Sequence, residues 1–507
     1  MLGSGTSLTN MKPQNQETKA SEVRATTSRD ILGFYAYAAA CGPYFLALGN
    51  FLPLMLSEFT TLAATDPDGT TCDPTNASSC IVGLLWGRVA PSTLSMYMSS
   101  IAVGIQAVTL ILFSALADRG LWRSRFILFC TLVGGISSST YVFFSDPHHY
   151  LPLAFMTVLA NSSIGVASAF YYSYLPVLVR YHPKVLQAIE QNSHLPSEAA
   201  DQAVAHVRDQ VSSRISGMAL SAGMVTGTLV IGSAALIGSY MPKGPFVQQL
   251  GAGMAGMWWL VLGLVGWWLL PRVQGPPVPR NRNVFTHSAC MHWNSFKNIG
   301  KSWYIWLGLL SWFFISDGLT TALLVTIFVG RSKLIGVTQT ESVFLSAAAP
   351  IFEAIALMML IKSKSHFFPK SSSKLINVIL AGVCCLMTLW GVLGLHTSVG
   401  IQTKTEYYIF FTVFVTLYTC LISFHRVLFA ELVPRGREAE FFGLYLISSR
   451  GTSWIGSTVV AVINEQTKVV RNGYYFVLVL FAGGVLAILP LNMTRGHRNA
   501  DKLAAQA

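Results

Sequence analysis

A short charged turn, SALADRGLWRSR at residues 114–125, joins two long apolar stretches of the sequence. The stretches cover residues 94–117 and 126–144, and each is long enough to cross a bilayer as a helix, which takes about 17 to 25 residues. The turn carries one carboxylate, Asp118, followed by three arginines. Because basic residues gather in cytosolic loops, the pattern is typical of two membrane helices joined in the cytosol.

The same pattern of apolar runs and polar turns extends in both directions along the 507 residues. Hydrophobic residues make up 52% of the chain and charged residues 11%, whereas a soluble protein carries about 25% charged residues, so an ordinary soluble enzyme is excluded. We predict an all-α polytopic membrane protein. Its twelve expected transmembrane helices cover residues 31–56, 94–117, 126–144, 151–178, 215–240, 252–271, 304–330, 342–362, 374–395, 407–428, 441–463 and 474–493.

The basic residues are distributed unevenly between the two sides of the membrane. There are 34 Lys and Arg against 22 Asp and Glu, a net charge of +12, and most of the basic residues lie on the cytosolic side if both termini are cytosolic. This asymmetry fixes the orientation and explains the charge without a nucleic-acid partner. The predicted parts are a cytosolic tail at 1–30, a six-helix bundle at 31–271, a cytosolic linker at 272–303, a second six-helix bundle at 304–493 and a cytosolic tail at 494–507.

The loop at residues 57–93 is expected on the opposite side. It contains Cys72, Cys80 and the glycosylation acceptor sequence that begins at Asn76. These features fit an oxidising, glycosylating compartment. We expect Asn76 to be glycosylated and Cys72 to pair with Cys80, the alternative being two free thiols.

Six spans, a basic linker and six further spans are the layout of the major facilitator superfamily, in which two helical bundles rock about a midplane site. Residues 114–125 resemble the signature loop of that superfamily. We expect Asp118 to face the positive N-terminus of helix 11 while Arg119 and Arg123 bridge neighbouring loops, so that the contacts exist only when the cytosolic gate is closed. Ordinary positive-inside charges would explain the arginines but not Asp118.

The connection between helices 10 and 11 reads ELVPRGREAEFFGLY at residues 431–445. Pro and Gly end one helix, and acidic residues lie favourably near the N-terminus of the next. The segment is interpreted as a gate or hinge. Its candidate gating residues are Glu431, Arg435 and Glu438.

Ionisable residues within the spans are candidates for substrate or proton binding, because a charge at a helix centre costs about 2.5 to 3.5 kcal/mol. Asp317 is central in helix 7, which lines the cavity in the superfamily, and Glu353 is central in helix 8. Each carboxyl could bind an ammonium group or a proton, or could instead form a structural hydrogen bond between helices. Arg450 in helix 11 could contact an acid or a substrate carboxylate, or extend to the cytosolic surface. Tyr35 and Asn161 are further polar candidates on expected cavity helices.

The chain also resembles the autophagy-related protein 22 group of fungal vacuolar amino-acid effluxers. The resemblance rests on the pattern at 431–445 and on Ser453-Trp454-Ile455-Gly456, the run around Asp317, Gly33-Phe34-Tyr35, Ala117-Asp118-Arg119 and Ser213-Arg214-Ile215-Ser216. The chain departs from the family at position 450, which is Arg where Lys is expected, and at Gly33-Phe34, where Gly-Trp is typical. These departures leave the substrate open.

The resemblance implies a vacuolar membrane protein that releases neutral, branched or aromatic amino acids to the cytosol after autophagy, with protons as a potential coupling ion. We expect no enzymatic activity and no cofactor or metal. One alternative is a facilitator-fold transporter of another small solute. The other is a membrane scaffold of the autophagy pathway that transports nothing.

Overall fold

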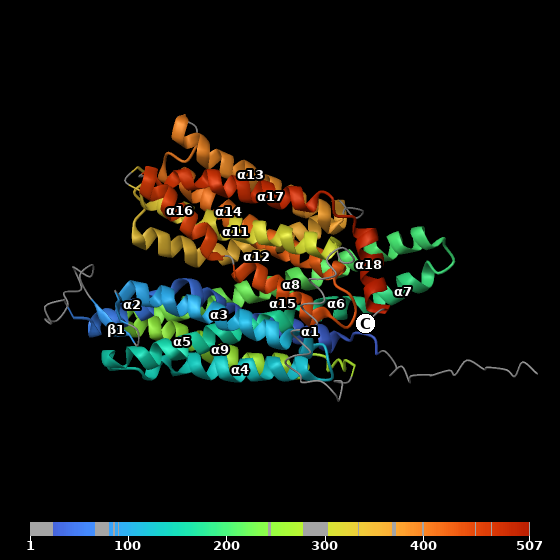
Figure 1. Ribbon diagram of the computed structural model, residues 1–507, viewed down its shortest axis with the longest axis horizontal. Helices are drawn as coiled ribbons and strands as arrows, with labels where there is room; N and C mark the ends of the chain where they lie inside the picture. Colours follow the sequence, from blue (N-terminus) through green and yellow to red (C-terminus); the bar gives the residue numbers. More distant parts are fainter. Residues whose placement is uncertain are drawn as a thin grey trace, which may run out of the picture.

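The computed structural model describes residues 24–65, 81–84, 87–89, 91–241, 245–276, 303–332, 334–367, 372–397, 400–451, 453–467 and 469–505. Most of these residues belong to long helices that run side by side in two groups (Figure 1). The predicted disulfide between Cys72 and Cys80, the acceptor Asn76, most of the N-terminal tail and most of the linker lie outside the described residues.

The first group, here called the N half, ends with α9. Its helices are α1 (Ser28–Asn50), α2 (Leu52–Ala63), α3 (Pro91–Ala117), α4 (Trp122–Ser139), α5 (Tyr150–Tyr172), α6 (Tyr174–Arg180), α7 (Pro183–Gln191), α8 (Ser197–Ser239) and α9 (Pro245–Leu269), with 3-10 turns η2 (Thr140–Phe143) and η3 (Pro147–His149). Between α2 and α3, strands β1 (Val82–Leu84) and β2 (Gly87–Val89) pair antiparallel, with Val82 opposite Val89.

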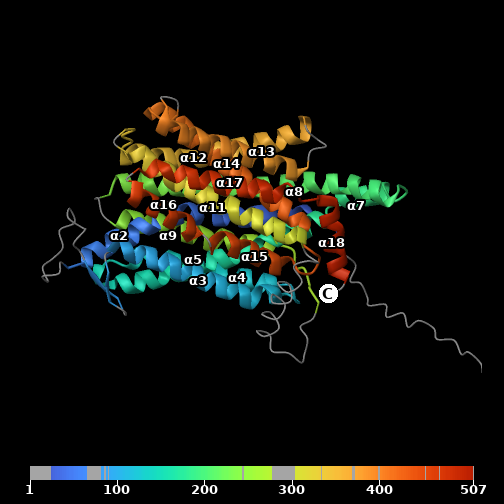
Figure 2. The same ribbon diagram turned by 45° about the horizontal axis from the view of Figure 1, so that its top comes forward.

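The second group, the C half, contains α11 (Trp303–Arg331), α12 (Gln339–Phe367), α13 (Ser373–His396), α14 (Lys404–Leu432), α15 (Glu438–Arg450), α16 (Ser453–Thr467), the 3-10 turn η5 (Val470–Asn472) and α17 (Gly473–Ile488). A final helix, α18 (Met493–Ala505), follows it. In both views α7 and α18 lie at one end of the bundles, and α2 lies at the other (Figures 1 and 2). We call these the α18 end and the α2 end.

Ten helical stretches within the described residues are long and apolar enough to cross a membrane. They coincide with ten of the twelve spans expected from the sequence. The two other expected spans, 342–362 and 441–463, correspond to α12 and to the pair α15 and α16. The all-α membrane fold is therefore confirmed, and the count of twelve stays a prediction.

Three expected spans are each divided into two helices. The run at 31–56 breaks at Phe51, where Pro53 opens α2, and the run at 151–178 breaks at Ser173, three residues before Pro176. A proline lacks the N–H that would continue the preceding helix. The run at 441–463 breaks after α15, whose C-cap is Gly451. These breaks place helix ends inside or near the bundle.

Residues 183–212 form α7 and the first part of α8, which continues without a break to Ser239. The predicted span at 215–240 is therefore only the second part of a 43-residue helix. Its first part extends beyond the bundle at the α18 end (Figure 1).

Helices α1 and α8 approach closely because both carry glycine at the contact. A β-carbon built on Gly42 would lie 2.0 Å from the carbonyl oxygen of Gly223. Between membrane helices, where lipid is as apolar as the side chains, small residues allow backbone contact and dense packing. The pair thus fixes α1 against α8 at the core of the N half.

We predict that Gly42→Ala destabilises the protein, because the added methyl group pushes α8 away. Overpacking of this kind costs about 1 to 3 kcal/mol. The measurement is the thermal unfolding midpoint of the purified protein in detergent. Gly232→Ala on the same α8 is the control, since no atom lies within 4 Å of its added β-carbon. Equal midpoints for the two variants would contradict the close contact.

Candidate functional site

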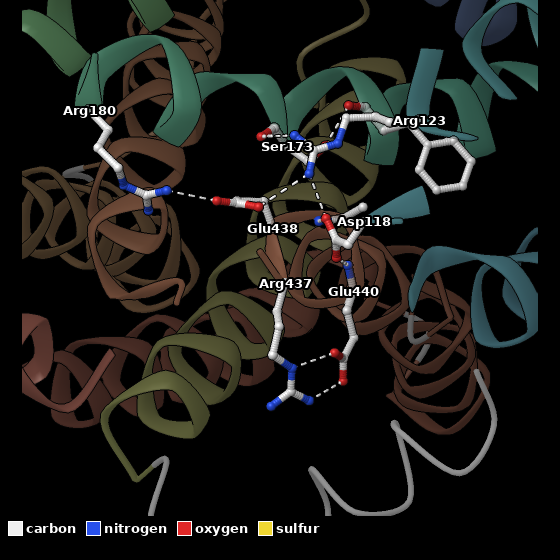
Figure 3. A network of polar contacts seen from close by, with 9 residues as sticks. Asp118, Arg123, Ser173, Arg180, Arg437, Glu438 and Glu440 are labelled. Carbon is white, nitrogen blue, oxygen red and sulfur yellow. Dashed lines mark hydrogen bonds and ion pairs between the residues drawn. The ribbon is translucent and has the colours of Figure 1, made fainter. Parts of the chain in front are cut away.

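A buried network of charged side chains joins the two halves at the α18 end (Figure 3). Arg123 of α4 lies 2.5 Å from Asp118 and 3.2 Å from Glu438, the first residue of α15. Arg180, at the end of α6, contacts the other oxygen of Glu438 at 2.9 Å. The structure thus brings together three residues predicted for the gate, Asp118, Arg123 and Glu438, and adds Arg180.

Asp118 also binds the N-terminus of α15 directly. Its two carboxylate oxygens accept hydrogen bonds from the backbone N–H groups of Ala439 and Glu440, each at 2.9 Å. These N–H groups have no partner within their own helix, and the helix dipole adds positive potential there. One carboxylate from the N half therefore satisfies the exposed end of a helix in the C half.

Local geometry fixes the turn that presents Asp118. Gly120 has φ of +49°, a left-handed conformation that favours glycine. Its N–H donates to the carbonyl of Pro276 at 3.1 Å and its carbonyl accepts from Gly275 N–H at 2.9 Å, so the chain leaving α9 supports the turn. Arg119 is half-buried and makes none of the ion pairs described above.

The ionised form of Glu438 is favoured by its surroundings. Burial acts to raise its pKa, but the guanidinium groups of Arg123 and Arg180 outweigh burial and hold the pKa below the ordinary value. The contribution of ionised Glu438 to the stability of this closed structure is therefore present at neutral pH, and it is lost only as the pH falls through this lowered pKa.

A second buried network joins the halves beside the first, and none of its residues is among the predicted site residues. Lys364 of α12 lies 2.8 Å from Asp209 of α8 and donates to Ser213 at 2.9 Å and to Ser373 at 3.1 Å. The N–H and hydroxyl of Ser373, at the start of α13, both donate to Asp209. The only sequence signal was one acidic residue in the amphipathic segment 183–212 opposite a cluster of lysines after helix 8.

The predicted gate residues Glu431 and Arg435 lie under α18 rather than in the Asp118 network. His497 of α18 hydrogen-bonds the carbonyl of Glu431 at 2.9 Å and contacts Arg208 of α8. Arg435 lies 3.8 Å from Asp501, an exposed pair. The C-terminal helix therefore bridges α8 of the N half and α14 of the C half.

An aromatic cluster lies in the C half, on α11, α14 and α15. The rings of Trp312 and Tyr445 stack with centroids 4.6 Å apart, and His425 stacks on Trp312 at 4.8 Å. The guanidinium of Arg426, only 3% exposed, lies 3.8 Å from the ring centroid of Tyr172 in the N half. Cation–π contacts of this kind strengthen when water is excluded, so the contact between Arg426 and Tyr172 helps to hold the two halves together.

Asp317 lies in α11, only 1% exposed, and faces Gly456 of α16 and Thr321 one turn away. Among the described residues, neither of its carboxyl oxygens nor the Thr321 hydroxyl accepts or donates a hydrogen bond of ordinary geometry. Glu353, by contrast, accepts a hydrogen bond from Thr419 of α14 at 2.5 Å. The two predicted acids therefore have different surroundings.

Arg450 lies where the halves meet. Its guanidinium is 5.8 Å from the ring centroid of Phe45 in α1, and Tyr172 and Tyr418 are within electrostatic range. Of the two further candidates, Tyr35 is half-buried on α1. Asn161 is buried within the N half, where the side-chain amide of Gln106 donates to its backbone carbonyl at 3.0 Å and contacts its side-chain oxygen at 3.4 Å.

The contacts between the halves define one conformation. They join α15 to α3 and α5, and α8 to α12 and α14, and include a hydrogen bond from the Ser221 hydroxyl to the carbonyl of Ala354 at 3.5 Å. Helix α16, toward the α2 end, packs on α11 and α17 of its own half. The structure is therefore closed at the α18 end.

Within the described residues, no group of three or more His, Cys, Asp or Glu side chains could hold a metal ion. The described cysteines that are free thiols are Cys41, Cys130, Cys384, Cys385 and Cys420.

The fold is that of the major facilitator superfamily of transporters. The chain matches the proton:xylose symporter XylE with a TM-score of 0.58 at 12% identity, covering 91% of this chain and 95% of that one. It matches the transporter FucP in its outward conformation with a TM-score of 0.55 at 11% identity, over 89% and 97% of the two chains. The human organic anion transporter MFSD10 gives a TM-score of 0.55 at 10% identity, over 91% and 99%.

Within this class, the chain belongs to the family described as "Vacuole effluxer Atg22 like", whose profile matches residues 26–501. Autophagy-related protein 22 of Coccidioides immitis is 25% identical over 95% of this chain and 90% of that protein. Autophagy-related protein 22 of Gibberella zeae is 26% identical, over 95% and 82%, and autophagy-related protein 22-1 of Emericella nidulans is 25% identical, over 95% and 93%. The family resemblance seen in the sequence is thus confirmed.

We predict that Arg123→Gln opens the α18 end, because it leaves Asp118 and Glu438 buried beside each other with less compensating charge. Removing one partner of a buried ion pair costs about 3 to 5 kcal/mol. A cysteine placed at buried Ser114, in a background without other cysteines, should then react faster with a water-soluble maleimide. The control is Arg125→Gln, since Arg125 lies over Trp122, outside the network. Equal labelling rates in all variants would show that Arg123 does not hold the α18 end closed.

We also predict that Asp209 and Lys364 are energetically coupled. The double variant Asp209→Ala/Lys364→Ala should be less destabilised than the sum of the two single variants, by about 1 to 3 kcal/mol, because each single change leaves a buried charge unpaired. The measurement is the unfolding free energy of the purified protein in a double-mutant cycle. Additive effects would mean that the pair does not hold α8 to α12.

Proposed function

We propose that this protein exports neutral amino acids, branched and aromatic ones in particular, from the vacuole lumen to the cytosol during autophagic recycling. The family to which the chain belongs and its transporter fold support a vacuolar effluxer. One observation carries the choice of substrate class: the carboxyl of Asp317 is buried and makes no hydrogen bond of ordinary geometry with a described residue, with the backbone of Gly456 as its near polar neighbour.

An ionised carboxylate in such a place costs several kcal/mol unless a cation compensates it. Two cations fit the position of Asp317: the ammonium group of an amino acid and a proton. Thr321 lies one turn along α11, and its hydroxyl also makes no hydrogen bond of ordinary geometry with a described residue. This hydroxyl can accept a hydrogen bond from a substrate ammonium group or from the protonated carboxyl of Asp317. Asp317 is therefore the proposed site of the substrate amine or of the coupled proton.

Arg450 is the proposed partner of the substrate carboxylate. A guanidinium can bind a carboxylate through two parallel hydrogen bonds. Its surroundings come from both halves: Phe45 and Tyr172 from the N half, and Tyr418 from the C half. These aromatic rings would make apolar contacts with a large neutral side chain of the substrate. Glu353, already hydrogen-bonded to Thr419, is proposed as a second titratable group beside this site.

We assign the α18 end to the cytosol and the α2 end to the lumen, which puts Asn76 and the proposed disulfide in the lumen. In the closed conformation, the Asp118 network, the Asp209 network and α18 seal the cytosolic end. Release of substrate requires that these contacts break while the luminal ends approach, as in the rocking of two bundles about a central site. Asp118, Arg123 and Glu438 are thus proposed as the cytosolic gate.

Two rival functions make different predictions. A facilitator for another solute would ignore amino acids in a competition panel and would not need both Asp317 and Arg450. A membrane scaffold that transports nothing would retain its function in the Asp317 variant and lose it when the cytosolic tails are removed.

We predict that Asp317→Asn lowers leucine uptake into vesicles containing the purified protein by at least about tenfold, a loss of about 1.4 kcal/mol or more in barrier terms. Asparagine keeps the shape but cannot become an anion. Ser316→Ala is the control, since the Ser316 hydroxyl bonds only the Phe313 carbonyl within its own helix. Undiminished uptake by the Asp317 variant would exclude the proposed role.

A second measurement separates the two roles of Asp317. If the group carries a proton, the variant should lose uptake driven by a pH gradient and keep exchange of substrate against substrate. If the group binds the amine, both processes should fail together.

Arg450→Lys should raise the half-saturating leucine concentration, because lysine keeps the charge and loses the bidentate geometry.

A further inference from the structure

A cavity of ≈ 680 Å³ opens at the α18 end of the N half, and its lining residues make none of the ion pairs between the halves described above. Three segments form its walls: residues 24–30 at the start of α1, residues 177–181 at the end of α6, and residues 268–274 that leave α9. None of these segments is used in the proposed transport site.

The charge of the cavity is strongly positive. Arg24, Arg29 and Arg272 line it, and among the described residues of its wall the one carboxylate is Asp30. Asp30 is buried and accepts hydrogen bonds from the N–H and hydroxyl of Thr27 at 2.8 and 2.7 Å, as the acidic partner of the α1 capping box. Both bonds end on the same oxygen, Oδ2, and the single negative charge of Asp30 offsets only one of the three arginine charges.

The walls are held in place by contacts between the segments. The N–H of Thr26 donates to the carbonyl of Tyr181 at 2.8 Å, and its hydroxyl donates to the carbonyl of Leu178 at 3.0 Å. The guanidinium of Arg29 lies 4.4 Å from the ring centroid of Trp268. The cavity is therefore defined by packed backbone and by an oriented arginine, not by free surface side chains alone.

We propose that this cavity binds a multiply charged phosphate ester, presented either as the headgroup of an anionic membrane lipid or as a free soluble compound. Guanidinium groups recognise phosphate oxygens through paired hydrogen bonds. Basic pockets between membrane helices on the cytosolic side are suited to phosphorylated headgroups. The exposed ring of Trp268, at 58%, suits a mouth at the level of the membrane interface, where tryptophan is enriched.

The cavity is connected to the gate by two short paths. Tyr181 in its wall follows Arg180, which binds Glu438 of α15. Gln274 in its wall precedes Gly275, whose N–H donates to Gly120 in the turn that presents Asp118. An anion bound to Arg24, Arg29 and Arg272 would hold the three wall segments together. Two of these segments adjoin Arg180 and Gly275, which position Glu438 and the Asp118 turn, so the bound ligand favours the closed conformation of the α18 end.

The test uses the purified full-length protein in lipid nanodiscs. One arm measures retention of a phosphatidylinositol bisphosphate by native mass spectrometry, and the other measures binding of soluble inositol hexakisphosphate in discs of phosphatidylcholine alone. The variant is Arg24→Gln/Arg29→Gln/Arg272→Gln. The control is Lys184→Gln/Arg495→Gln/Lys502→Gln, which removes three exposed charges from the same end without touching the cavity. Equal unfolding midpoints establish that both variants are folded.

We expect the cavity variant to bind at least about tenfold more weakly than the wild type in one or both arms, and the control to bind as the wild type does. Loss in the lipid arm alone identifies a membrane headgroup, and loss in both arms identifies a free phosphate ester as a sufficient ligand. Binding that is equally weak in wild type and variant, or lost equally in the control, overturns the proposal. Because leucine uptake is not the readout, failure here leaves the proposed transport function untouched.

Discussion

The carboxylate of Asp118 placed on the N-terminus of α15 is the contact on which the closed form depends. It joins a turn of the N half to a helix end of the C half through two N–H donors, and Arg123 and Glu438 complete the charge balance. All of these groups are buried, so each relies on the others to offset the loss of water. A contact that is stable only as a complete set is suited to two discrete states, formed or broken.

The charged groups at the α18 end and at the centre follow opposite rules. At the end, Asp118, Glu438 and Asp209 are each compensated by an arginine or lysine and by hydrogen bonds. In α11, the carboxyl of Asp317 is buried and makes no hydrogen bond of ordinary geometry with a described residue. A satisfied network holds a conformation, whereas an unsatisfied carboxyl favours arrival of a mobile cation. Burying a charge is costly in both places. At the α18 end, the buried charges pair with one another and hold the halves together, whereas in our proposal Asp317 pairs with a cation that arrives from solution.

Interrupted helices position both the ion pairs at the α18 end and the surroundings of Asp317. The break at Ser173 ends α5 and starts the short α6, whose final residue Arg180 reaches Glu438, while the carbonyl of Ser173 accepts from Arg123 at 3.3 Å. The interruption between α15 and α16 sets the small residue Gly456 against Asp317. In a bilayer such irregular backbone is tolerated only where protein or a water-filled space satisfies it.

The sequence by itself determined the membrane character, the helical spans, the family and the chemistry of the turn at 114–125. These follow from local properties: the length of apolar runs, the placement of basic residues and the cost of a carboxylate in or near lipid. Only the tertiary structure decided which distant residues meet. Arg180 with Glu438, Lys364 with Asp209, and Arg426 with Tyr172 pair residues more than 150 positions apart. Their partners depend on how two bundles dock, and docking is set by packing across the whole interface, which no local pattern in the chain records.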